Sequence, residues 1–296
     1  MARGKVEQAV PEGAVHLWHE GILFLGSGIR NALHRHFTAS IVFALAEPFS
    51  FRAERQRWRT LRGVAVAPNI YQQMDSIGRR VAILQVDPET EAYARMARLF
   101  AERGPVVELA GAVVDRLVAA AGDAERPDLD AAALWARTLD EVAGPWQHAA
   151  TIDPRVAQAQ DLIKRSFPSA PSVAALAAAV GLSASRLIHL WKDEVGISLR
   201  RYVLWLRLRH VIARITIGDS LTDAAHDAGF ADSAHLSRTF SSMFGLPLSR
   251  LFGPAARVRL LLKLPDAELS GPHGPYDRPR WDAAAQRLRQ PPRRQG

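Results

Sequence analysis

Residues 173–196 read VAALAAAVGLSASRLIHLWKDEVG, and residues 221–245 read LTDAAHDAGFADSAHLSRTFSSMFG. Both stretches place a small residue in a first helix, then a glycine, then a leucine and an aromatic residue in a second helix, and a closing glycine. The matched pairs are Val173 and Leu221, Ala177 and Ala225, Gly181 and Gly229, Leu187 and Leu236, Trp191 and Phe240, and Gly196 and Gly245. The offset is 48 residues up to the turn glycine and 49 after it. This repeat predicts two helix-turn-helix units.

Each shared position has a physical reason. Two helices that cross steeply need a small side chain at their contact, and a turn glycine permits positive φ. The second helices are expected to begin near Ala184 and Ser233, because Ser183 and Asp232 can cap their free amides. An i, i+3, i+4 spacing predicts buried faces that comprise Leu187, Leu190 and Trp191 in one helix, and Leu236, Phe240 and Met243 in the other.

Between the two units, residues 199–215 read LRRYVLWLRLRHVIARI. Apolar side chains follow one stripe, and arginines at 200, 201, 207, 209 and 214 occupy the rest. The pattern predicts one long amphipathic helix that spaces the two units.

At these residues the chain resembles the DNA-binding domain of the AraC/XylS family of transcriptional regulators. The resemblance covers roughly residues 154–253 and is most specific in the segment AAHDAGFADSAHLSRTFSSMFGLPLSRLF. Three positions depart from the usual family pattern. Trp191 stands where the family usually has phenylalanine, and Leu251 stands where an aromatic or positively charged residue is common. Ile188 is expected to face outward on the first reading helix. The resemblance implies a sequence-specific regulator, expected to be an activator, whose partners are double-stranded DNA, a small-molecule effector, RNA polymerase and a second copy of the chain.

The two second helices would then enter successive major-groove segments about 34 Å apart. Arg238 is the strongest candidate for direct base reading, because a guanidinium can bind guanine O6 and N7 together. The other candidate DNA-binding residues are Ser185, Arg186, His189, Lys192, Arg200, Arg201, Arg207, Ser233 and Ser237. Of these, Lys192, Arg200, Arg201 and Arg207 are expected to contact phosphate, although each could equally be a solvated surface residue.

Charge follows the same division. Residues 1–153 hold 17 Lys and Arg against 19 Asp and Glu, whereas residues 155–253 hold 12 against 7 and residues 254–296 hold 9 against 4. Basic helices near a polyanion release counterions, which favours DNA binding.

The chain has no cysteine, which excludes disulfides and thiol catalysis. Its longest apolar run, near residues 40–46, is too short to span a bilayer, so the sequence predicts a soluble, cytoplasmic protein without a membrane partner.

The first half has a different pattern. Short apolar segments in residues 14–87, broken by Gly, Pro and Asn, predict an antiparallel β-barrel or sandwich. Helical periodicity follows near residues 91–103, 105–121 and 129–143. The predicted fold is therefore α+β, with a cupin-like effector-binding and dimerisation domain at 1–150, a double helix-turn-helix domain at 151–256, and a basic tail at 257–296 that is expected to be disordered. Within that tail, the run RVRLLLKL could extend the last helix or form a short added strand, and residues 281–288 could form a brief helix.

His34 and His36 could carry chemistry in the first domain. A strand would place both imidazoles on one face, as in the first metal motif of cupins. The glutamate expected next is absent, since Ser40 and Ile41 stand there, and Gln72 and Gln73 occupy the later histidine position. We therefore predict no metal and no other cofactor, and assign His34, His36 and Gln72 to hydrogen bonds with an effector or, equally, to a polar barrel mouth.

Enzyme signatures are absent from the sequence: there is no phosphate loop, no GxSxG elbow and no HExxH pair. The chain is accordingly predicted not to be an enzyme. Two alternatives stay open at this point. One is a cupin-type metalloenzyme whose helical half supports oligomerisation, and the other is an architectural DNA binder without ligand control.

Overall fold

A computed structural model describes residues 10–18, 20–88, 90–124, 129–145, 152–253 and 255–262. Contacts divide the chain into two compact units. The sheet unit comprises residues 1–150 together with 237–261, and the helical unit comprises residues 151–236 together with the end of the chain. The predicted α+β class is confirmed.

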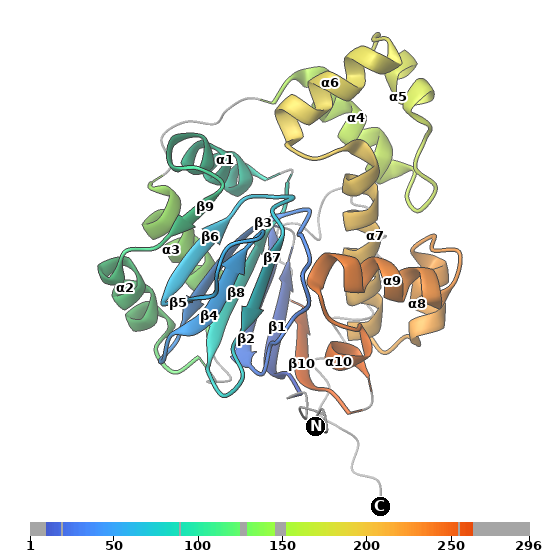
Figure 1. Cartoon of the computed structure of the whole chain (residues 1–296). Helices are drawn as coiled ribbons and strands as arrows, with labels where there is room; N and C mark the ends of the chain where they lie inside the picture. The colour runs from blue at the N-terminus through green and yellow to red at the C-terminus, as the bar shows by residue number, and fades with distance from the viewer. Residues whose placement is uncertain are drawn as a thin grey trace, which may run out of the picture. The chain divides into compact units, whose positions relative to one another are not determined.

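Two antiparallel sheets form the sheet unit (Figure 1). The larger has the order β10-β1-β2-β8-β3-β6-β9, and the smaller has the order β5-β4-β7. Their strands are β1 (Glu12–Trp18), β2 (Gly21–Ser27), β3 (Ala39–Ala44), β4 (Phe49–Ala53), β5 (Arg59–Leu61), β6 (Gly63–Val66), β7 (Gln72–Asp75), β8 (Val81–Val86), β9 (Val106–Glu108) and β10 (Arg257–Leu262). Of these strands, β1, β2, β3, β6 and β8 match the short apolar segments that predicted a barrel or sandwich, whereas β9 and β10 lie outside residues 14–87.

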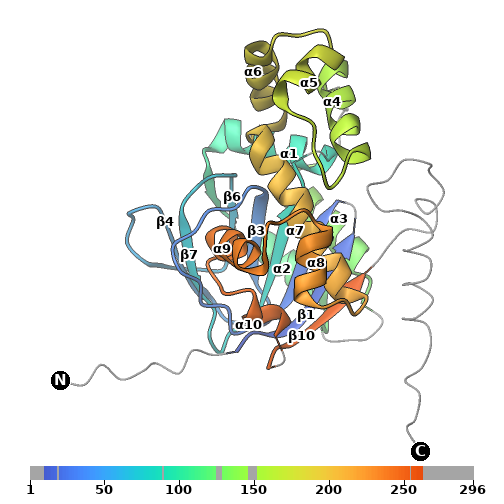
Figure 2. The same cartoon turned by 90° about the vertical axis from the view of Figure 1, so that its right-hand side faces the viewer.

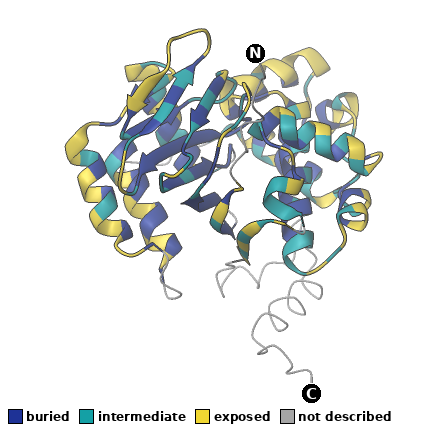
Figure 3. Ribbon diagram, turned by 60° about the horizontal axis from the view of Figure 1, so that its bottom comes forward, coloured by how far each residue is buried: buried dark blue, intermediate teal, exposed yellow. Residues whose placement is uncertain are grey.

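The inner strands of the larger sheet are buried on both faces, whereas its edge strands β9 and β10 are partly exposed. Every residue of β3 is buried, whereas β4 alternates between buried and half-exposed residues, as a strand with one solvated face does. Alternate residues of β8, such as Leu84, join a core cluster with the helices α1 (Glu91–Arg103), α2 (Gly111–Ala121) and α3 (Ala131–Ala143). Figure 3 shows these helices with exposed outer faces and buried inner faces. Their amphipathic pattern therefore explains where they pack.

The helix expected at 105–121 is shorter than predicted. Residues 106–108 form β9, which pairs with β6, and α2 begins only at Gly111. Val106 and Val107 are β-branched and find an open edge on β6, so sheet pairing overrides the helical pattern. The helix predicted at 91–103 is α1 with the same bounds, and the one predicted at 129–143 is α3.

The start of the predicted tail forms the added strand, which was one of the two structures expected for it. Residues 257–262 form β10, which lies beside β1 at the edge of the larger sheet. The remainder of the predicted tail, including the helix suggested near Trp281, lies outside the described residues.

Helices build the other unit in the predicted order: α4 (Pro154–Arg165), α5 (Val173–Ala179), α6 (Ala184–Val195), α7 (Leu199–Thr216) and α8 (Leu221–Asp227). The next helix, α9 (Ser233–Phe244), begins in this unit, but its residues from Ser237 onward and the short α10 (Ser249–Phe252) belong to the sheet unit. The linker helix expected at 199–215 is α7, and Figure 2 shows α4–α6 at its first end and α8 at its other end. Among the described residues, no single helix has the length and apolarity to cross a membrane; α5 and α6 meet that test only as a bent pair.

Candidate nucleic-acid interface

The first helix-turn-helix unit consists of α5 and α6, whose axes bend by 87° at the turn. Gly181 lies in this turn with φ of 68°. Ser183 caps α6 by accepting a hydrogen bond from the Arg186 amide at 3.2 Å, and Gly196 ends the helix in a left-handed conformation. A steep crossing closed by a positive-φ glycine is the geometry of a DNA-binding helix-turn-helix.

The second unit uses the same local devices. Gly229 lies after α8 with φ of 76°. Asp232 caps α9 by accepting a hydrogen bond from the His235 amide at 2.5 Å, and Gly245, which follows α9, has φ of 68°. The predicted starts of α6 at Ala184 and of α9 at Ser233 are therefore confirmed.

The apolar faces of α6 and α9 are buried as predicted. Leu187 and Trp191 in α6, and Leu236, Phe240 and Met243 in α9, are at most 1% exposed. Leu190 is half-buried. The opposite faces carry the candidate base-reading side chains. Ser185, Arg186, His189, Lys192 and Arg238 are exposed, and Ser233 and Ser237 are half-buried. Both helices thus present polar residues outward, which a reading helix requires.

The arginines of α7 do not share one environment. Arg200 is exposed and Arg201 is half-buried. Arg207 is half-buried: its Nη2 donates a hydrogen bond to the Pro168 carbonyl oxygen at 3.1 Å, and burial lowers its pKa. Arg209 is 3% exposed. Part of the Arg207 guanidinium is thus engaged with the backbone, whereas Arg200 is exposed on the same helix.

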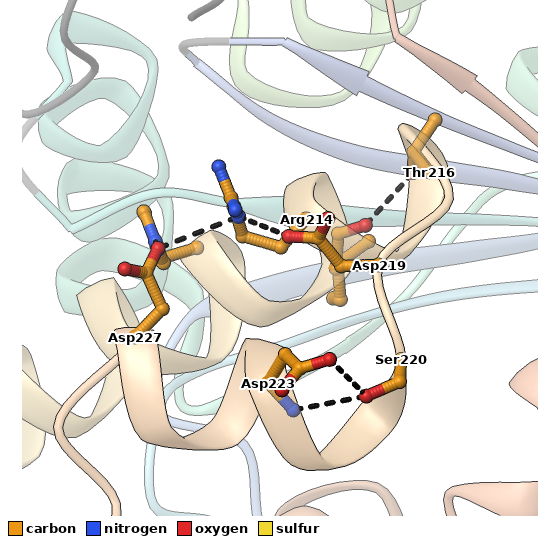
Figure 4. Close-up of polar contacts among 8 residues, drawn as sticks. Arg214, Thr216, Asp219, Ser220, Asp223 and Asp227 are labelled. Atoms are coloured by element: carbon orange, nitrogen blue, oxygen red, sulfur yellow. Dashed lines mark hydrogen bonds and ion pairs between the residues drawn. The ribbon is translucent and has the colours of Figure 1, made fainter.

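A polar cluster that the sequence did not predict joins α7 to α8. His210 Nε2 lies 2.8 Å from Asp227 Oδ2, and Arg214 Nε lies 3.4 Å from the same oxygen (Figure 4). Arg214 also forms an ion pair with Asp219. Burial lowers the pKa of His210, and Asp227 opposes that shift. The spacing of His210 and Arg214 at i and i+4 on a helix is the signal that could have indicated a shared partner.

We predicted that the histidine pair of the sheet unit lies on a strand. It lies instead in a loop before β3. Residues 28–37 pair with their neighbours only through isolated bridges, Arg30 with Asp75 and His34 with Gln72. The imidazoles still meet: His34 Nε2 lies 2.8 Å from His36 Nε2. Gln72 and Gln85 each place an amide nitrogen 3.1 Å from His36 Nδ1. The structure thus brings His34, His36 and Gln72 together, and adds Gln85, which sequence reasoning missed.

We call this cluster the histidine network. Its donor and acceptor roles follow from the Ala32 carbonyl, with which His34 forms a hydrogen bond. The Ala32 carbonyl can only accept, so His34 Nδ1 donates to it at 2.9 Å and His34 Nε2 must accept from His36. His36 Nδ1 then accepts from the two amides, and Gln85 Oε1 accepts from the Thr38 hydroxyl at 2.5 Å. Both imidazoles are neutral in this arrangement. Burial accordingly lowers the pKa of His34 to about 4 and that of His36 well below 6.5, with His34 as a further cause for His36.

Among the described residues, the hydrogen-bond partners of the two imidazoles and of Gln85 are amides, a hydroxyl and a backbone carbonyl. Within the described ranges, no three His, Asp or Glu side chains are grouped so that they could hold a metal ion. The donor set fits hydrogen bonding better than metal coordination.

The histidine network adjoins the end of α9 within the sheet unit. The Ala32 amide donates a hydrogen bond to the Gly245 carbonyl at 2.8 Å. The His36 ring lies 5.8 Å from the Phe244 ring. A Cβ at Gly245 would lie 2.5 Å from the Ala32 carbonyl oxygen and 2.8 Å from His34 Nδ1, so this position accepts only glycine. The loop that carries the histidines is therefore in direct contact with the residues that end α9.

Comparison with known proteins agrees with this geometry. The helix-turn-helix domain family matches residues 176–253. No curated protein sequence matches the chain. Among solved structures, the apo form of a ToxT variant from Vibrio cholerae strain SCE256 is similar over 82% of this chain and 95% of its own, with 11% identity and a TM-score of 0.54. At this identity the likeness establishes the fold alone.

Two further structures are similar. One is a transcriptional regulator with an AraC-type DNA-binding domain from Chromobacterium violaceum, with 24% identity over 33% of this chain and 92% of its own and a TM-score of 0.31. The other is wild-type ToxT from Vibrio cholerae strain SCE256 with bound unsaturated fatty acid, with 11% identity over 83% of this chain and 94% of its own and a TM-score of 0.47. The family match and the paired units together identify residues 176–253 as a helix-turn-helix domain of the AraC type.

Proposed function

We propose that α6 and α9 read two neighbouring major-groove segments on one face of DNA, about one helical turn apart. One observation carries this proposal. Both helices begin at a capped turn after a positive-φ glycine, bury an apolar stripe and leave a polar stripe exposed. Because α7 is continuous over Leu199–Thr216, it acts as a stiff spacer between the two readers.

Within this interface we assign different roles to different side chains. Arg238 is exposed on α9 and can bind guanine in the bidentate manner. Ser185, Arg186, His189, Ser233 and Ser237 are further candidate readers, and Lys192, Arg200 and Arg201 are candidates for phosphate contacts that fix the register without reading sequence.

Two single substitutions test these roles. Arg238→Ala should lower discrimination at one position of the site by about 1 to 3 kcal/mol. Arg200→Ala should weaken binding to all duplexes alike and reduce the salt slope by about 1. Fluorescence anisotropy on a selected site and on its point variants, at several salt concentrations, measures both quantities. An Arg238→Ala protein that keeps the wild-type sequence preference would remove Arg238 from the readers, and uniformly strong binding to random DNA by the wild type would favour an architectural binder.

The histidine network is our candidate for effector control. We propose that a small polar ligand hydrogen-bonds to His34, His36 and Gln72, and that its binding changes DNA affinity. The network is buried, neutral and rich in donors and acceptors, and its loop contacts Gly245 directly after α9. A ligand that alters this loop would favour one state of the end of α9 over another, which is the requirement for coupling between two sites.

A screen of small polar metabolites for thermal stabilisation tests this control. At least one compound should raise the melting temperature of the wild type and change its affinity for the selected site, and neither effect should occur in a Gln72→Leu, His36→Leu variant. A compound that stabilises both proteins equally binds elsewhere. If no compound alters DNA affinity, the sensory role fails.

We further propose that the regulator acts in the cytoplasm as a homodimer, engages RNA polymerase and has no catalytic activity. An open groove of about 470 Å³ between α2 and α3, lined by both apolar and charged side chains, supports the proposed pairing. The groove is lined by Arg116, Ala119, Ala120, Leu129, Asp130, Ala133, Leu134 and Arg137. Sedimentation of the wild type and of an Ala120→Arg variant measures the oligomeric state, and a wild type that remains monomeric at micromolar concentration would contradict the pairing.

A further inference from the structure

Three segments of the helical unit meet at one place, which we call the junction. They are the loop between α4 and α5 at Phe167 and Pro168, the middle of α7 at Arg207 and His210, and the end of α8 at Asp227 with the following turn. The loop leads into the first helix-turn-helix unit, and Asp227 closes the first helix of the second unit. The junction is therefore the place where the two reading units are fixed to one another.

The first side of the junction joins α7 to the loop before the first unit. Arg207 Nη2 donates to the Pro168 carbonyl oxygen at 3.1 Å. One turn further along α7, the His210 ring lies 4.9 Å from the Phe167 ring. A charged hydrogen bond and a ring contact thus hold the same loop against one face of α7.

The second side joins the same turn of α7 to the second unit. His210 Nε2 lies 2.8 Å from Asp227 Oδ2, and Arg214 reaches that oxygen from the next turn (Figure 4). The turn after α8 also packs against these residues, because a Cβ at Gly229 would lie 3.2 Å from Pro168 Cβ and 3.3 Å from Arg207 Nη2. Arg207 therefore lies between the loop of the first unit and the turn of the second.

These contacts are not a general property of the repeat. The offset of 48 residues places Ala179 of α5 opposite Asp227 of α8, so the first unit has no carboxylate at this position. The first turn of α9, up to Leu236, belongs to the same compact unit as α4–α8. Fixing Asp227 and Gly229 against α7 consequently fixes where α9 begins relative to α6.

We infer that Arg207 and Asp227 are positioning residues that set the separation and rotation of the two reading helices, and thereby the spacing of the DNA blocks that the protein accepts. This inference rests on the proposed function. It assigns to Arg207 a role that acts through Pro168 and the turn at Gly229, and not a contact with phosphate. Loss of the junction leaves each reader able to bind its own block, but removes the fixed distance between them.

The effect on DNA binding is predictable from duplex geometry. Adding one base pair between two blocks shifts them by about 3.4 Å and rotates them by about 35°. A protein with a rigid junction cannot follow that change without loss of contacts, whereas a protein with a loosened junction follows it at lower cost. The spacer profile, which is affinity measured against the number of base pairs between the blocks, therefore reports the stiffness of the junction.

The experiment uses the full chain, a duplex with both blocks from a selected site, duplexes with the spacer changed by one or two base pairs, and a duplex with one block scrambled. The variants are Asp227→Asn and Arg207→Gln. Asp161→Asn is the matched control, because it makes the same change in an exposed i, i+4 pair with Arg165 on α4, away from the junction. Thermal unfolding of each protein confirms that it is folded at the temperature of the assay.

We expect wild type and Asp161→Asn to lose about tenfold or more in affinity when the spacer changes by one base pair. Asp227→Asn and Arg207→Gln should bind the natural spacer about three- to tenfold more weakly, bind the single block as the wild type does, and show a flattened spacer profile. Spacer profiles parallel to that of the wild type, with affinity lowered equally on every duplex, would overturn the inference. If Asp227→Asn and Arg207→Gln do not fold, Arg207→Lys, which keeps the charge but loses the planar geometry, decides by the same profile. A wild type that shows no two-block preference would instead refute the proposed function.

Discussion

The two helix-turn-helix units have the same glycine in the turn but different surroundings for it. Gly181 and Gly229 have φ of 68° and 76°. A Cβ at Gly181 would meet nothing within 4 Å, whereas a Cβ at Gly229 would press on Pro168 and Arg207. The space beside the first turn glycine is open, whereas the second turn glycine packs against other residues. Equal sequence patterns therefore do not imply equal mechanical roles.

The difference extends along both units. The first unit has Ala179 where the second has Asp227, which is bound to His210 and Arg214. Gly196 ends α6 at an exposed position, whereas the carbonyl of Gly245 accepts a hydrogen bond from Ala32 of the sheet unit. Polar contacts thus hold the second unit at both of its ends. Four predictions test this contrast.

The largest expected effect concerns the apolar packing of the first unit. Trp191 is fully buried and its ring lies 5.1 Å from that of Tyr202 on α7. Trp191→Ala should lower the free energy of unfolding of the helical unit by about 3 to 5 kcal/mol. Urea denaturation monitored by circular dichroism measures this loss. Ile188→Ala, at a position 48% exposed on the same helix, is the control and should change stability by no more than about 0.5 kcal/mol. A loss below about 1 kcal/mol for Trp191→Ala would contradict the described packing.

The second prediction concerns pH and the polar contact at the end of α9. Unfolded histidine takes up a proton near pH 6.5, whereas His34 stays neutral in the folded protein down to about pH 4. Stability is therefore fully present above pH 6.5 and is lost as the pH falls towards 4, by on the order of 3 kcal/mol for His34. Denaturation at pH 7.5, 5.5 and 4.5, together with hydrogen exchange of the Ala32 amide, measures the loss.

A His34→Gln, His36→Gln variant provides the control for this pH dependence, because carboxylates elsewhere also contribute to acid sensitivity. The variant should show a smaller decrease in stability between pH 6.5 and 4 than the wild type does. Identical decreases in both proteins would mean that the histidine network does not titrate as described.

The third prediction compares the two turn glycines directly. Gly181→Ala should cost about 1 kcal/mol, because only the positive φ opposes it. Gly229→Ala should cost about 2 to 3 kcal/mol, since the added methyl group also contacts a proline ring and a backbone oxygen. Chemical denaturation of both variants gives the difference, and equal losses would remove the distinction between the open and the packed turn glycine.

The smallest expected effect concerns the caps, which the units share. Ser183→Ala and Asp232→Ala should each cost about 1 kcal/mol, because each leaves one amide at the start of a helix without its partner. Similar losses would show that the units differ in their attachments and not in their local helix signals. A cap that costs more than about 2 kcal/mol would indicate a further contact of that side chain.

Local features of this chain could be predicted from the sequence and non-local ones could not. The starts of α6 and α9 followed from caps and glycines within a few residues, and the bounds of α1 followed from helical periodicity. β9 was missed because its pairing with β6 depends on residues some forty positions away. The same reason applies to Arg207, whose partner Pro168 is 39 residues distant, and to the loop position of His34, which depends on an isolated bridge to Gln72.

Selection of bound fragments from random duplex DNA by the full chain tests the central claim most directly. The account predicts that enriched fragments contain two preferred blocks whose centres lie about one helical turn, or 10 to 10.5 base pairs, apart. Enrichment of a single block, of blocks at variable distances, or of no sequence at all would contradict a regulator that reads DNA with two helices fixed by α7 and the junction.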